Sequence, residues 1–192
     1  GYDPALRDHY IVIGARLDNM GCSDIMVNGE KRQTIYYGAN GNASGLAMLA
    51  QLARKLKTNS VLLRRSVIIA AFGSSLDMGA GAWYFLNRSF AGADKIDAMI
   101  NLDMLGTGSS GFYAYTASNR DLDAIITRLS GTLQPVQPKL VSLEPVNSDH
   151  RILYDRQIPA VFFTTGMSPE YNSDSDTASV LEYYDMEREL EY

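Results

Sequence analysis

The run Tyr10-Ile-Val-Ile-Gly-Ala15 is rich in β-branched and aromatic residues and follows a polar lead-in, which is typical of a central β-strand. Runs of the same kind recur at residues 67–72, 98–103 and 160–164, and a shorter one lies at residues 112–115. The run at 67–72 contains no polar residue, which predicts a buried strand. We therefore expect a sheet built from these five segments.

Helical patterns separate the expected strands. Leucine and alanine recur at helical spacing between residues 43 and 57, and Asn42 is placed to cap that helix. Further helices are expected around residues 81–87 and 122–129, after residue 150 and from residue 180. The alternation predicts an α/β fold over residues 1–192 as one domain, in three layers: a mostly parallel mixed sheet with helices on both faces.

The composition narrows the classes of function. The chain has 192 residues, with 17 Lys and Arg against 22 Asp and Glu and a formal net charge of −5, so nucleic acid is excluded as a partner. The longest apolar run is residues 67–72, far short of the roughly 20 residues that span a bilayer, so no transmembrane segment is expected. No signal-peptide pattern opens the sequence. The single cysteine, Cys22, excludes an internal disulfide and a multi-thiolate metal site.

Polar side chains stand where the expected strands end. Arg16 and Asp18 follow the first strand, Ser75 the second, and Asp103 ends the third. Since ligands bind beyond the carboxyl ends of parallel strands, we expect these residues to converge with the loops 148–150 and 171–177. The long segment 18–40 is rich in Gly, Asn and Asp and predicts a loop with a weak strand at 34–37.

This set of residues bears on three chemistries: zinc hydrolysis, a serine triad and calcium binding. A zinc hydrolase needs three His, Asp or Glu ligands, and the chain has only two histidines. His9 lies on a polar lead-in and is expected at the surface, whereas a role for His150 stays open. A triad of Ser75, Asp149 and His150 is disfavoured because neighbours in sequence do not orient each other easily. The acidic loop at 172–176 lacks the glycine of a calcium loop.

Taken together, the motifs resemble the zinc aminopeptidases with two co-catalytic metals, the family that includes the glutaminyl cyclases. The stretch from Tyr10 to Asp18 is similar to the family's strand ending in His-x-Asp, and Gly38-Ala-Asn-Gly41-Asn-Ala-Ser-Gly45 is similar to its Gly-Ala-x-Asp-Asn-Ala-Ser-Gly. The segments 71–76, 100–104, 148–150 and 171–177 resemble the remaining motifs in the same order. The resemblance covers nearly the whole chain and implies the α/β fold named above.

The resemblance implies that the metal site has degenerated. The family's five metal ligands fall on Arg16, Gly41, Leu76, Asp103 and Asn172, and its general-base glutamate falls on Ser75. Only Asp103 is retained, and glycine, leucine and a guanidinium bind no zinc. We therefore expect no metal and no cofactor where the family uses two zinc ions, and no intact catalytic residue, with Ser75 and His150 as degenerate positions.

The expected function is that of a pseudoenzyme. Arg16 is expected to pair with Asp103 in place of one zinc, with a bidentate contact as one available geometry, and Leu76 to fill the space of the other. A peptide or protein ligand is expected in a crevice lined by nine residues: Arg16, Asp18, Gly41, Leu76, Asp103, Asp149, His150, Asn172 and Asp176. The alternative is a residual metallo-aminopeptidase or other hydrolase that uses Asp103 and His150.

Two further expectations follow from the resemblance. Family members usually carry an upstream segment with an edge strand, so we expect either more sequence before Gly1 or another chain covering that edge. The family also implies an extracytoplasmic location, whether periplasmic, secreted or surface-anchored.

Overall fold

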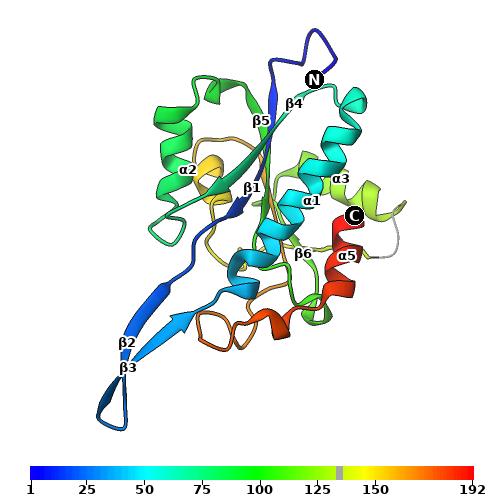
Figure 1. The fold of residues 1–192 in the computed structure, drawn as a ribbon. Coiled ribbons are helices and arrows are strands. Elements are labelled where there is room, and N and C mark those ends of the chain that lie inside the picture. The colour runs from blue at the N-terminus through cyan, green and yellow to red at the C-terminus, as the bar shows by residue number, and fades with distance from the viewer. Residues whose placement is uncertain (133–135) are drawn as a thin grey trace.

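The computed structural model describes residues 1–132 and 136–192. A six-stranded sheet has the order β4-β1-β5-β8-β6-β7 (Figure 1). Its strands are β1 (Tyr10–Arg16), β4 (Ser66–Phe72), β5 (Ile96–Leu102), β6 (Tyr113–Tyr115), β7 (Lys139–Val141) and β8 (Ala160–Thr164). All neighbouring pairs are parallel except β6 with β8. The expected mostly parallel mixed sheet is confirmed.

Helices cover both faces of this sheet (Figure 1). They are α1 (Ser44–Thr58), α2 (Ala80–Tyr84), α3 (Arg120–Ser130), α4 (His150–Tyr154) and α5 (Tyr183–Glu191). Side chains alternate across β1, so Val12 packs in a core with α2 and α4, and Ile13 packs in a second core with α1 and α5. The three-layer arrangement is therefore also confirmed, and no helix among the described residues is long and apolar enough to cross a membrane.

The segment 18–40, expected to be a loop with a weak strand at residues 34–37, is instead a β-hairpin whose second strand includes most of that expected strand. Strands β2 (Gly21–Val27) and β3 (Glu30–Tyr36) form a separate two-stranded sheet that projects from the body of the molecule (Figure 1). Apolar patterns in the sequence do not signal these strands, because the strands are polar, lie outside the core and pair only with each other. Met26 and Ile35 are exposed on this hairpin.

Strand β4 is an edge strand rather than a buried central one. Its only neighbour among the described strands is β1, and Ile69 is 40% exposed. An uninterrupted apolar run is typical of a strand that is covered on both faces, but the face of β4 that carries Ile69 and Ala71 is partly exposed. The expectation of a buried strand at residues 67–72 is wrong in this respect.

The two strands that matter for the site are adjacent. In the six-stranded sheet, β4 follows β1 in sequence and lies on one side of it, and β5 comes later in sequence and lies on the other side. A crevice forms beyond the carboxyl ends of the strands at such a switch in strand order. Because Ala15 is in register with Leu102, the next residues, Arg16 and Asp103, lie side by side at the carboxyl ends of β1 and β5.

Candidate functional site

Arg16 and Asp103 form a buried ion pair at the carboxyl ends of β1 and β5. Nη2 of Arg16 donates to Oδ1 of Asp103 at 3.2 Å, and each residue is only 3% exposed. The predicted pairing is confirmed, but through a single hydrogen bond rather than a bidentate contact. Nε and Nη1 of Arg16 have no partner among the described residues.

A hydroxyl completes the environment of Asp103. Ser148 donates to Oδ2 of Asp103 at 2.7 Å and accepts from the amide of Asn101 at 2.9 Å. Burial raises the pKa of Asp103, and the Arg16 charge and the Ser148 hydroxyl oppose that shift. Both carboxylate oxygens are therefore engaged by protein donors, which leaves Asp103 little capacity to ligate a metal ion.

A second pair of acids lies beside this ion pair. Oγ of Ser75 donates to Asp149, which is fully buried, at 2.8 Å, and the backbone N–H of Ser75 donates to Asp18 at 3.1 Å. Burial raises the pKa of Asp149 to about 7, and the nearby charges of Asp103 and Asp18 add to the shift. Arg16, Asp18, Ser75, Asp103 and Asp149 therefore converge as the sequence indicated.

Asp176 stabilises the turn that leads into α1. Its carboxylate accepts from the backbone N–H groups of Asn40 at 2.7 Å and Gly41 at 3.0 Å, and the residue is 2% exposed. A Cβ atom built on Gly41 would lie 3.3 Å from the Asp176 carboxylate and 3.4 Å from the ring of Tyr171. The space beside Gly41 is thus taken by Tyr171 and Asp176, where the family resemblance places a bridging aspartate.

The N-cap of α1 is Ala43 rather than the expected Asn42, but the Asn42 side chain still contacts the start of this helix and has a wider role. Its Oδ1 accepts from the backbone N–H groups of Gly45 and Met104, at 3.0 and 2.9 Å. Its Nδ2 donates to the carbonyl of Leu102 at 2.9 Å. The side chain therefore ties the start of α1 to the end of β5. The cap pattern signals the Gly45 contact, whereas nothing local in the sequence signals the two contacts to β5.

Leu76 and Asn172 are both exposed. Leu76 is 45% exposed, so the prediction that it fills the space of the second zinc is wrong. The turn after β4 leaves its side chain in solvent, and the space beside Gly41 is taken by Tyr171 and Asp176 instead. Asn172 has a left-handed backbone, with φ of 57°.

His150 lies away from these acids, over β8 and β6. Its ring stacks on Phe162 at 4.6 Å between centroids and meets Tyr115 edge-on at 5.9 Å. Burial lowers its pKa to about 4. Nε2 is 3.0 Å from Oε1 of Glu144, without the alignment of a hydrogen bond. No hydrogen bond joins His150 to Asp103 or Asp149 in the described part of the chain, and sequence reasoning missed Glu144 altogether.

The residues present do not fit a two-metal centre. Within residues 1–132 and 136–192, no three His, Cys, Asp or Glu side chains are grouped so as to share a metal ion. Arg16 brings a fixed positive charge to the position of one ligand, and Gly41 offers no donor atom. The arrangement is a buried cluster of hydrogen-bonded acids around one arginine, and it is not chemically suited to Lewis-acid catalysis by paired metal ions.

Comparison with known proteins agrees with this fold. The sequence profile of peptidase family M28 matches residues 2–189. Among solved structures, the chain resembles the LapA aminopeptidase of Legionella pneumophila at 20% identity with a TM-score of 0.75, covering 95% of this chain and 49% of that one. It resembles BSAP, a zinc aminopeptidase of Bacillus subtilis, at 18% identity with a TM-score of 0.74, covering 98% and 45%.

The glutaminyl cyclase of Porphyromonas gingivalis is similar at 16% identity with a TM-score of 0.68, covering 98% of this chain and 72% of that one. These likenesses concern the fold. The chain spans about half the length of the two aminopeptidases. No curated protein matches it by sequence.

Proposed function

Because this chain belongs to peptidase family M28, we propose that it is a non-catalytic relative of the zinc aminopeptidases that binds a peptide or a protein. The proposal combines two facts about the same crevice. Polar groups still converge there, including Asp18, Ser75 and Asp149. The positions that match the family's metal ligands, however, carry side chains that bind no zinc, apart from Asp103.

The single observation that carries the proposal is the buried contact between Arg16 and Asp103. A guanidinium that donates to the retained aspartate supplies a positive charge without an exchangeable coordination position. In hydrolysis a zinc ion activates a bound water molecule by lowering the pKa of that water, and a guanidinium cannot do this. Substrate that reaches this crevice is therefore held without being cleaved by a metal-bound nucleophile.

The decisive experiment measures zinc and turnover together. The purified chain, dialysed against zinc and then against buffer, is assayed for bound metal by mass spectrometry and for hydrolysis of aminoacyl chromogenic substrates. We expect substoichiometric zinc and no zinc-dependent turnover. Two zinc ions per chain, or turnover abolished by a chelator and restored by zinc, would overturn the proposal. A thermal-shift screen with amino acids and short peptides then identifies the ligand.

The alternative is a residual hydrolase that uses Asp103 and His150. The pKa of Asp149, raised to about 7 beside Oγ of Ser75, favours some acid–base capacity in the crevice. Against it, His150 is engaged with Phe162 and Glu144 and not with the acids. Turnover that is lost in both His150→Ala and Asp103→Asn would favour this alternative.

Location and assembly complete the proposal. An extracytoplasmic location rests on the family resemblance alone, and fractionation of the source cells with an antibody to the chain tests it. Coverage of the free β4 edge, by another part of a longer protein or by a second copy, is supported by the position of β4 at the end of the sheet. Sedimentation of the chain across a range of concentrations separates the two.

A further inference from the structure

A cleft of about 510 Å³ lies over β5, on the face of the sheet that carries α1, α3 and α5 (Figure 1). Its volume falls in the range of about 300 to 1,000 Å³ that is usual for small-molecule sites. Arg16, Asp103 and the acids around them do not line it. We call it the β5 cleft and define it by six residues: Leu52, Leu56, Ile100, Ile125, Glu189 and Tyr192.

The lining of the β5 cleft is almost entirely hydrocarbon, and part of it stays exposed. β5 has β1 and β8 on its two sides, yet Ile100 on this face is only half-buried. Leu52 and Leu56 of α1 are half-buried as well, and Ile125 of α3 is 42% exposed. A hydrocarbon chain that lies in the cleft removes this apolar surface from water, which favours binding.

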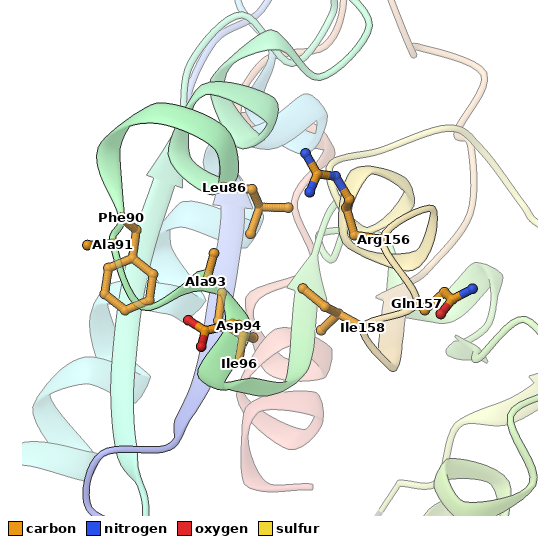
Figure 2. Close-up of a pocket in the computed structure, with 9 residues that line it drawn as sticks. All are labelled: Leu86, Phe90, Ala91, Ala93, Asp94, Ile96, Arg156, Gln157 and Ile158. Atoms are coloured by element: carbon orange, nitrogen blue, oxygen red, sulfur yellow. The ribbon is translucent and has the colours of Figure 1, made fainter.

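A second cavity, where β5 and β8 begin, does not offer the same surface (Figure 2). It is larger, at about 640 Å³, but Asp94, Arg156 and Gln157 form part of its lining. Its apolar residues Leu86 and Ile96 are each only 6% exposed, so little of their surface is left to cover. The β5 cleft is therefore the better site for an apolar ligand.

One acid is built into the hydrocarbon lining of the β5 cleft. Glu189 belongs to α5, lines the cleft and is only 7% exposed. Its Oε2 atom is buried and has no hydrogen-bond partner among the described residues. Buried polar atoms nearly always have a partner, so this atom indicates a donor that the described part of the chain does not supply.

Glu189 stands near one end of the β5 cleft. A Cβ atom built on Gly108 would lie 2.6 Å from Oε1 of Glu189, so the carboxyl group lies against Gly108, which follows the carboxyl end of β5. Helix α1 starts at that same end, where Asn42 contacts Leu102, and its 15 residues run away from it, so Leu56 in its last turn lies far from the acid. An extended ligand therefore has its polar end at Glu189 and its hydrocarbon toward Leu56.

The charges near Glu189 select a cationic head group. Burial raises the pKa of Glu189 to about 8, and the negative charges of Asp185 and Glu182 add to the shift. The same charges repel an anionic ligand and attract a cation. Arg188, the basic residue of α5, contacts Asp185 at 3.5 Å and lies over the ring of Tyr184. The balance of charge at Glu189 is negative, and it favours an ammonium group over a carboxylate.

We propose that the β5 cleft binds an aliphatic primary amine. Its ammonium group donates to the Glu189 carboxylate, and its hydrocarbon chain covers Ile100 and Leu56. Glu189 releases its proton to solvent when the ammonium group binds, so that one carboxylate and one ammonium group face each other. The site is independent of the proposed function, because the cleft lies under the helices on one face of the sheet and not at the strand ends that hold Arg16 and Asp103.

The test uses the whole chain and four probes: octylamine, octanol, octanoate and ethylamine. Binding is followed by amide chemical shifts in ¹H–¹⁵N NMR. We expect octylamine to bind about 10-fold more tightly than octanol, the lower range for a hydrogen bond to a charged group. Octanoate should bind more weakly than octanol, and ethylamine, which has almost no hydrocarbon to bury, more weakly than octylamine. The shifts are expected in four segments: residues 52–56, 98–102, 122–129 and 186–192.

Four results would overturn the proposal. Three of them come from the probes: octanoate that binds as tightly as octylamine, shifts confined to the cavity of Figure 2, and no binding at millimolar octylamine. The fourth is a chain that dimerises without any amine, with shifts in residues 52–56 and 122–129 that grow with protein concentration. That result would place a second copy of the chain in the cleft.

Matched variants assign the two ends of the ligand. Glu189→Gln is expected to weaken octylamine about 10-fold and to leave octanol unchanged, whereas exposed Glu191→Gln should change neither. Ile125→Ala, at an exposed position of α3, should weaken octylamine and octanol alike, by about 4-fold for each methylene that loses its contact. Exposed Thr127→Ala on the same helix is its control. Unchanged octylamine binding in Glu189→Gln or in Ile125→Ala would contradict the assignment of that end.

Discussion

Nη2 of Arg16 lies 3.2 Å from Oδ1 of Asp103, between two residues that are each 3% exposed. Removing one partner of a buried ion pair leaves an uncompensated charge, which costs about 3 to 5 kcal/mol, whereas removing both costs much less. We therefore expect Arg16→Met and Asp103→Leu each to lower the free energy of unfolding in urea by about that amount, and the double variant to recover part of the loss. If the double variant loses the sum of the two, the residues act independently and the ion pair does not stabilise the fold.

The environment of Gly41 predicts that the lost aspartate cannot simply be restored. A side chain at this position meets the ring of Tyr171 and the carboxylate of Asp176 at 3.3 to 3.4 Å. The backbone φ of Gly41, −115°, is one that other residues adopt, so the obstacle is space and charge. We expect Gly41→Asp to destabilise the chain by about 1 to 3 kcal/mol and Gly41→Ala by less.

The double variant Gly41→Asp/Tyr171→Ala tests this cause. Removing the ring makes room. Gly41→Asp should therefore lower the free energy of unfolding less in the Tyr171→Ala background than in the wild type. Urea unfolding of the four chains gives the comparison. A fully stable Gly41→Asp single variant would mean that room for a bridging carboxylate persists.

The contact between Arg16 and Asp103 was predicted from the family resemblance, which places both positions around one zinc ion. The structure adds the physical reason, because the two residues end adjacent parallel strands in register. The apolar run of β1, whose successive side chains point to opposite faces, correctly predicted a strand that is covered on both faces. The hairpin of β2 and β3 was missed because its stability does not depend on a buried apolar stripe, and residues such as Asp24 and Lys31 pair with each other in solvent.

The details of the site depend on loops, and there sequence reasoning was weaker. The direction of Leu76 is set by the turn after β4, and the position of Tyr171 beside Gly41 is set by a loop far away in sequence. The proximity of Glu144 to His150 likewise results from the path of the segment between β7 and α4. Such placements depend on tertiary packing and leave no periodic signal in the sequence.

Glu189 predicts a pH dependence of stability. The residue is 7% exposed in an apolar region near Leu190 and Tyr192, and Oε2 has no partner among the described residues. Burial, with help from the charges of Asp185 and Glu182, raises its pKa to about 8. The folded chain therefore keeps this proton up to about pH 8, whereas the unfolded chain releases it near the ordinary value of 4.5.

Between those two pH values the unfolded state binds fewer protons, so the free energy of unfolding falls as pH rises. Glu189→Gln removes this contribution and is expected to be more stable than the wild type near pH 8, by on the order of 3 kcal/mol. Asp149 titrates in the same range, so the difference between variant and wild type is the quantity to measure. Exposed Glu191→Gln is the control, and an identical pH profile for wild type and Glu189→Gln would contradict the assignment.

Asp176 is predicted to stabilise the turn before α1. Its carboxylate is the acceptor for the backbone N–H groups of Asn40 and Gly41. An unsatisfied buried donor costs about 1 to 3 kcal/mol, so Asp176→Ala should destabilise the chain by at least that amount and speed hydrogen exchange at these two amides. Asp176→Asn keeps one acceptor oxygen, so its stability and exchange rates should lie between those of the wild type and Asp176→Ala. Exposed Asp174→Ala should change neither measurement. Unaltered exchange at Asn40 and Gly41 in Asp176→Ala would refute this role.

The open edge of β4 predicts an alternation in hydrogen exchange. The backbone N–H of Ser66 donates to His9 and the carbonyl of Phe72 accepts from Leu17, so even-numbered residues of β4 face β1. The amides of Val67, Ile69 and Ala71 then point to the open side, because successive residues of a parallel ladder alternate in direction. In dilute solution we expect these three amides to exchange faster than those of the even-numbered residues.

Concentration distinguishes what covers this edge. If a second copy pairs there, protection of the odd-numbered amides rises with protein concentration, in step with the sedimenting mass. Ile69→Pro removes one of the outward N–H groups and should abolish that rise. If the edge is covered instead by another part of a longer protein, the odd-numbered amides of this chain stay fast at every concentration and slow down only in the longer protein. Slow exchange of the odd-numbered amides in a dilute, monomeric sample of this chain would contradict the open edge itself.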